Sequence, residues 1–116
     1  MNIVPPPFSA SLARHGSVLH LHLTGELDLA SVPELNAALP QPEPAETLLM
    51  DLRRLDFIDS SGIHVLMRLD VAARSEGWSL VLVRAPVLVQ RVLDICHLGD
   101  RIRIVDSPAE ISPSLA

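Results

Sequence analysis

Apolar and polar residues alternate near the start of the chain with the period of two that is typical of half-buried strands. Leucines alternate with polar residues over 18–23, and a shorter strand is predicted over residues 8–14. His15 and Gly16 between these segments favour a turn. The two segments are therefore expected to form an antiparallel hairpin at the edge of a sheet.

Further along the chain, the apolar pattern changes to the helical period of about 3.6 residues. Helices are predicted over residues 31–39, 60–77 and 86–96, with a short terminal one over 108–115. Ser31 and Glu34 have the spacing of a capping box at the start of the first helix. Gly77 closes the second and longest helix, because glycine readily adopts the left-handed conformation of a helix end.

Mostly apolar runs over residues 47–52, 79–83 and 102–105 predict strands that alternate with the helices. That order predicts an α/β fold with a mixed, mainly parallel sheet of four to five strands. An antiparallel N-terminal edge strand and about four flanking helices complete it. Residues 8–116 are expected to form this single domain, and residues 1–7, with three consecutive prolines, a flexible lead-in.

Charge and composition exclude several classes of partner. The 116-residue chain has a net charge of −5 and no lysine, so it lacks the basic stripe that nucleic-acid binding requires. No apolar run approaches the roughly 20 residues of a membrane span, and the start does not resemble a secretory signal. Cys96 is the single cysteine, which excludes an internal disulfide. We expect a cytoplasmic protein that binds neither nucleic acid nor membrane.

The loops after the predicted strands form the expected functional edge, because ligands of parallel sheets bind at the carboxyl ends of the strands. Two of these loops, residues 24–30 and 55–61, are rich in acidic and hydroxyl residues. The second contains Asp59 and Ser60 directly before the longest helix. One interpretation is a helix cap by either residue. The other keeps the cap and adds phosphorylation of Ser60.

Phosphorylation of Ser60 would change the charge of this edge. A phosphoserine carries about −1.5 to −2 charges, and the fold tolerates it near the positive end of a helix dipole. The same dianion beside Asp56 and Asp59 would cost a partner several kcal/mol of association energy, and about 1.4 kcal/mol is tenfold in affinity. Ser60 is therefore predicted to switch a protein–protein contact off.

Four short motifs follow one another along the chain. They are Leu23-Thr24-Gly25-Glu26-Leu27-Asp28, Met50-Asp51-Leu52, Phe57-Ile58-Asp59-Ser60-Ser61-Gly62 and Arg91-Val92-Leu93-Asp94. Together they resemble the motifs of the STAS domain family, and in particular those of anti-anti-sigma factors. The resemblance covers about residues 10–106 and implies a mixed sheet flanked by helices.

The resemblance implies a non-enzymatic anti-sigma factor antagonist. Such a protein binds an anti-sigma factor that is also a serine kinase, frees a sigma factor, and is inactivated when the kinase phosphorylates the first serine of the turn, here Ser60. The partner would bind the ATP and a serine phosphatase would be a further partner, so no cofactor is expected in this chain. The residues implied to contact the partner are Gly25, Glu26, Asp28, Asp59, Ser60 and Ser61.

Ile63 and Met67 flank the apolar stripe of the long helix just beyond Ser60. Both are candidates for an extension of the contact surface, with the margin of the core as the alternative.

Two other functions stay open. The domain could be a non-switching STAS subunit of a lipid-transport or stress-sensing assembly, with Ser60 only a cap, or it could bind a nucleotide itself.

Other reactive residues favour ordinary structural roles. His20 and His22 lie on the same face of a predicted strand, but no third ligand is placed beside them by sequence, so no metal site is expected. His64 stands four residues after Ser60 without a nucleophile elbow, which argues against hydrolase chemistry. Cys96 falls on an apolar stripe and is expected to be buried. At the end of that helix, either His97 or Gly99 is expected to adopt the left-handed cap conformation.

Overall fold

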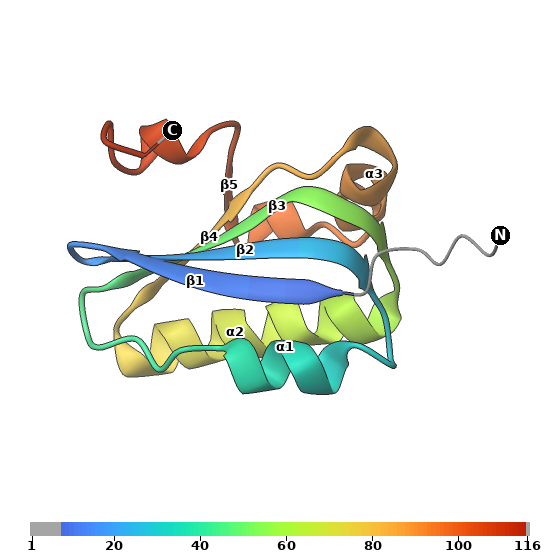
Figure 1. The fold of residues 1–116 in the computed structure, drawn as a ribbon, viewed down its shortest axis with the longest axis horizontal. Coiled ribbons are helices and arrows are strands. Elements are labelled where there is room, and N and C mark those ends of the chain that lie inside the picture. The colour runs from blue at the N-terminus through green and yellow to red at the C-terminus, as the bar shows by residue number, and fades with distance from the viewer. Residues whose placement is uncertain (1–7, 116) are drawn as a thin grey trace, which may run out of the picture.

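A mixed sheet forms the centre of the molecule (Figure 1). The computed structural model describes residues 8–115, and the lead-in predicted for residues 1–7 lies outside the described residues. Within this range the strands are β1 (Ser9–His15), β2 (Val18–Leu27), β3 (Thr47–Ile58), β4 (Ser79–Val83) and β5 (Arg103–Val105). They lie in the order β1-β2-β3-β4-β5, with β1 antiparallel to β2 and the others parallel. The predicted fold class and antiparallel edge strand are confirmed.

The helices are α1 (Val32–Ala38), α2 (Ser60–Glu76) and α3 (Val87–Ile95), followed by the short 3₁₀ turns η1 (Leu98–Asp100) and η2 (Pro108–Glu110). Helices α1 and α2 lie next to each other on one face of the sheet (Figure 1). The terminal helix predicted over residues 108–115 is wrong, because only the turn η2 forms there. Pro113 lacks the N–H group that a continuing helix needs.

The alternation of β2 decides which side chains enter the main core. Leu19, Leu21 and Leu23 are buried with residues of α1, α2 and α3. On the other face of the sheet, Leu49 of β3 belongs to a smaller cluster that is closed by Leu115. The C-terminal segment therefore covers part of the second face. The histidines of β2 alternate with the core leucines and belong to this second face.

Strands β2 and β3 extend beyond their predicted ends. Both continue toward the loops, to Leu27 and Ile58, so Gly25 and Glu26 lie in β2 and not in a loop. The parallel register shifts between His22 and Thr24 and again between Gly25 and Glu26. Such bulges break the period of two, which is why this segment reads as a loop in the sequence.

The ends of the helices correct one prediction and decide one alternative. Gly77 caps α2 in the left-handed conformation at φ +80°, as predicted. After α3, His97 adopts the left-handed conformation at φ +57°, and Gly99 does not. Cys96 is exposed, so its predicted burial is wrong, because α3 ends at Ile95 and the cysteine lies beyond its apolar stripe.

No helix within residues 8–115 has the length and apolarity that crossing a membrane would require.

Candidate functional site

The carboxyl ends of β2 and β3 bring the two candidate loops together. Leu27 pairs with Ile58 as the last residue of each strand, and the Asp59 N–H donates a hydrogen bond of 3.2 Å to the Leu27 carbonyl. The chain leaves these paired ends as Asp28 on one side and as Asp59 and Ser60 on the other. In Figure 1 both exits lie at the end of the sheet where α1 and α2 begin. The expected common edge is therefore present.

Asp59 caps α2, which decides between the two candidate capping residues. Its Oδ1 atom accepts hydrogen bonds from the backbone N–H groups of Ser61 at 2.9 Å and Gly62 at 3.3 Å. Ser60 is the first residue of α2 and is exposed, and its hydroxyl has no hydrogen bond to any residue of the range 8–115. Capping and the exposed hydroxyl thus belong to different residues, and the cap does not depend on the Ser60 hydroxyl.

Ser31 fixes the loop that carries Asp28. The Ser31 hydroxyl donates to the Glu26 carbonyl at 2.7 Å and accepts from the Asp28 N–H at 2.9 Å. The Ser31 N–H donates to Asp28 Oδ1 at 3.0 Å. The capping box predicted for Ser31 and Glu34 is wrong, because the buried Ser31 side chain faces this loop and makes no cap bond to α1. Ser31 was missed as a contributor to the site, because its bonds depend on how the loop folds back onto the end of β2.

The other candidate residues differ in what they offer to a partner. Glu26 is exposed, while Gly25 is buried within β2 at φ +88° and Ser61 is half-buried. Met67 is 43% exposed on α2. Ile63 is only 5% exposed and packs in the main core, so it can add almost no contact area to a partner surface.

Two apolar residues at this edge were missed by the sequence analysis. Leu29, in the loop after β2, is 74% exposed, and Phe57, near the end of β3, is 44% exposed. Leu29 stands between Asp28 and Ala30, and Phe57 follows the register shifts of β3, so periodicity does not show which way either side chain points. Exposed apolar side chains within an acidic edge are typical of a protein contact surface. We call the surface around these loops the serine-loop surface, defined by the exposed residues Glu26, Leu29, Phe57, Ser60 and Met67 and by the half-buried Asp28.

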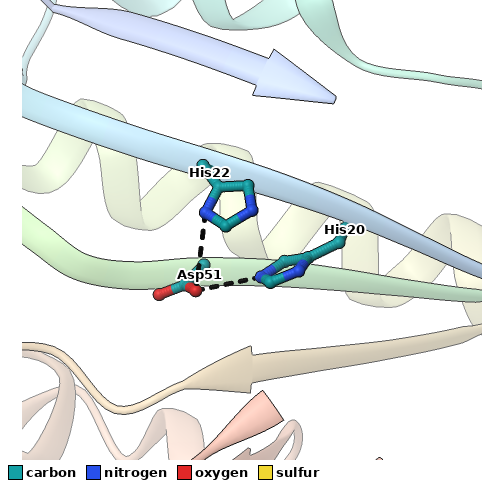
Figure 2. A group of neighbouring side chains, drawn as sticks. All are labelled: His20, His22 and Asp51. Atoms are coloured by element: carbon teal, nitrogen blue, oxygen red, sulfur yellow. Dashed lines mark hydrogen bonds and ion pairs between the residues drawn. The ribbon is translucent and has the colours of Figure 1, made fainter. Parts of the chain in front are cut away.

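A second group of polar side chains lies on the open face of β2 and β3. His22 and Asp51 are partners in the parallel register, and His20 lies two residues before His22 on the same face. Figure 2 shows both imidazole rings directed toward the Asp51 carboxylate, with His20 Nε2 at 2.9 Å and His22 Nδ1 at 3.7 Å from Asp51 Oδ2. The premise that nothing completes the histidine pair is therefore wrong, because strand register supplies Asp51.

Arg53 completes the environment of Asp51. Its Nε donates to Asp51 Oδ1 at 2.9 Å and its Nη2 donates to Asp51 Oδ2 at 2.7 Å. Burial raises the pKa of Asp51, but the hydrogen bonds from Arg53 and His20 outweigh it and bring the pKa to about 2. Burial and the neighbouring His20 lower the pKa of His22. At neutral pH the carboxylate is ionised and the His22 ring is uncharged.

A match over most of its length shows the family to which the chain belongs. Residues 10–106 match the family described as "Mlab, STAS domain". This match covers most of the chain, and the chain therefore belongs to the STAS domain family. The family and the extent that the sequence motifs indicate are confirmed.

Within that family, the chain is similar to anti-sigma factor antagonists. It is 31% identical over 98 residues to the anti-sigma-F factor antagonist RsfA of Mycobacterium tuberculosis, an alignment that covers 78% of this chain and 74% of RsfA. Its fold is similar to the crystal structure of an anti-sigma factor antagonist from Mycobacterium paratuberculosis, with a TM-score of 0.79 and 18% identity over 94% of both chains. It is also similar to the unphosphorylated form of the anti-sigma factor antagonist SpoIIAA, with a TM-score of 0.65 and 23% identity over 90% of this chain and 95% of SpoIIAA.

Proposed function

We propose that this protein is an anti-sigma factor antagonist that binds an anti-sigma factor through the serine-loop surface and thereby releases a sigma factor. The surface combines carboxylates with the exposed apolar side chains of Leu29, Phe57 and Met67. Interfaces of this kind derive affinity from apolar contacts and orientation from the charged residues around them. The similarity to RsfA, which is itself described as an anti-sigma-F factor antagonist, supports this role.

The switch is phosphorylation of Ser60. The observation that carries this proposal is the separation of roles at the start of α2: Asp59 caps the helix, and the exposed Ser60 hydroxyl is left without a partner among residues 8–115. A phosphate on Ser60 would lie near the positive end of the helix dipole, so the fold itself would tolerate it. Next to Asp28 and Asp59, this phosphate would add negative charge to the edge and weaken the binding of a partner that recognises the unmodified edge.

Catalysis belongs to the partner under this proposal. The antagonist acts in the cytoplasm on an anti-sigma factor that is also a serine kinase and that binds the ATP. A serine phosphatase would restore the active form. SpoIIAA, with a similar fold, is described in an unphosphorylated form, which supports the view that this fold is used in two modification states.

Mass spectrometry tests the modification directly. The full chain is incubated with purified anti-sigma factor kinases from the same organism and ATP, and the intact mass is followed with time. One phosphate should be added to the parent and to Ser61→Ala, and none to Ser60→Ala. Equal labelling of Ser60→Ala and the parent would contradict the assignment of Ser60.

The competing function is a non-switching subunit of a larger assembly, with Ser60 serving only at the start of the helix. Co-purification of Ser60→Asp with the partner separates the two. The switch predicts loss of the complex, whereas a structural subunit would retain it.

Calorimetry of the isolated chain with ATP and GTP excludes or establishes nucleotide binding by the domain itself.

A further inference from the structure

We propose that His20, His22 and Asp51 form a binding site for a divalent transition-metal ion of the Zn²⁺ type, separate from the serine-loop surface. The three side chains come from two adjacent parallel strands, and the register of β2 against β3 places them on one face of the sheet. Each offers one ligand atom, and these atoms all lie within 4.8 Å of one another. Two imidazoles and one carboxylate are a common ligand set for such ions.

The distances are close to those that a bound ion requires. Metal–ligand bonds of about 2.1 Å in tetrahedral geometry separate neighbouring ligand atoms by roughly 3.4 Å. Asp51 Oδ2 lies 2.9 Å from His20 Nε2 and 3.7 Å from His22 Nδ1. The first separation is about 0.5 Å shorter and the second about 0.3 Å longer than the required value, and the two imidazole nitrogens lie within 4.8 Å of each other, so side-chain rotation can supply the difference. The strand backbones need not move.

Burial holds two ligands in place and leaves the third accessible. His20 and Asp51 are each 3% exposed, while the side chain of His22 is 44% exposed. His22 and Asp51 also line an open cavity of about 550 Å³ over this face of the sheet. An ion can enter from this side, and water can occupy the coordination positions that the protein leaves free.

The donor types favour a transition metal over Mg²⁺ or Ca²⁺. Those two cations prefer shells made of oxygen atoms, whereas imidazole nitrogen suits zinc and its neighbours in the first transition row.

Arg53 is the competitor for this site. Its guanidinium makes two hydrogen bonds to the Asp51 carboxylate, one of them to the oxygen that faces the histidines. The Arg53 side chain is 43% exposed and can turn into solvent when an ion replaces it on Oδ2. Metal binding is thus an exchange of one cation for another on Asp51. Removal of the Arg53 charge should strengthen it.

Isothermal titration calorimetry of the full chain with Zn²⁺, and with Mg²⁺ as the comparison ion, tests the proposal. We expect one Zn²⁺ per chain, a loss of affinity of at least tenfold in His22→Ala, and no comparable binding of Mg²⁺. Arg53→Gln should bind Zn²⁺ several-fold more tightly than the parent. His22 is half-exposed, so its replacement leaves the core intact.

Matched controls address two of the three other histidines and the exposed cysteine. His64→Ala removes an exposed histidine outside the group, and the double variant Cys96→Ser/His97→Ala removes two adjacent potential ligands. Both should bind Zn²⁺ like the parent. In nitrogen-15 spectra of the imidazoles, Zn²⁺ should shift Nε2 of His20 and Nδ1 of His22. Unchanged affinity in His22→Ala, or loss of binding in the double variant, would overturn the proposal.

Discussion

Gly62 lies so close to Leu27 that a Cβ atom added to the glycine would stand 2.8 Å from Leu27 Cγ and 2.8 Å from Ile58 Cγ1. This approach joins the first turn of α2 to the ends of β2 and β3, from which both candidate loops leave the sheet. The glycine at this position is therefore required by packing and not by its φ angle.

Replacement of Gly62 by alanine should destabilise the protein. The new methyl group meets two fully or nearly fully buried side chains, and overpacking of this kind costs about 1–3 kcal/mol. Urea denaturation measures the change in the free energy of unfolding. Gly99→Ala is the control, because the nearest atom to its added Cβ is 3.7 Å away. Equal stability of the two variants would show that the contact at Gly62 is easily relieved.

The Asp59→Ala variant should lose the N-terminal cap of α2. Two backbone N–H groups that now donate to Asp59 Oδ1 would have to bond to water, at a cost of about 1 kcal/mol. Thermal unfolding of Asp59→Ala and of the control Asp56→Ala, an exposed carboxylate of β3, measures the effect. If Asp56→Ala is as unstable as Asp59→Ala, the loss reflects general charge and not capping.

Ser60→Asp should separate stability from binding. A negative charge at the first position of α2 is neutral or stabilising by about 0.3–1 kcal/mol, because it faces the positive end of the helix dipole. The same charge should weaken partner binding at least tenfold, measured by surface plasmon resonance against the anti-sigma factor. Ser60→Asn is the uncharged control and should keep most of the affinity. If Ser60→Asp lowers the stability of the protein and leaves its affinity for the partner unchanged, the switch is wrong.

His97→Gly should stabilise the protein. His97 has φ +57°, where side chains other than glycine cost roughly 1 kcal/mol, and its side chain is exposed. We expect a gain of about 0.5 kcal/mol after the entropy that glycine adds to the unfolded chain is subtracted. Ala45→Gly, at φ +71°, offers a parallel measurement.

Gly77→Ala provides the opposite substitution, because Gly77 has φ +80° and ample space around it. It should lose about 1 kcal/mol through backbone strain alone. If chemical denaturation shows a loss for His97→Gly and a gain for Gly77→Ala, the left-handed conformations do not control stability at these two helix ends.

Local sequence patterns predicted most of the helices and strands, because each of these elements depends on residues that are close together in the chain. The alternating leucines of β2 and the apolar stripe of α2 correspond to the two faces that these elements present to the core. The strand ends at Leu27 and Ile58 were missed because register shifts break the alternation there, and a register shift is a property of two strands together.

The sequence by itself determined the order of the elements, the fold class and the turn that presents Ser60, since these depend on periodicity, helix capping and glycine conformation within a few residues. Only the tertiary structure decided that Ser31 fixes the Asp28 loop, that Ile63 is buried, and that Asp51 meets His20 from 31 residues away in the chain. Those outcomes depend on which strands pair and in which register. That choice is made by the packing of the whole core, and no local pattern records it.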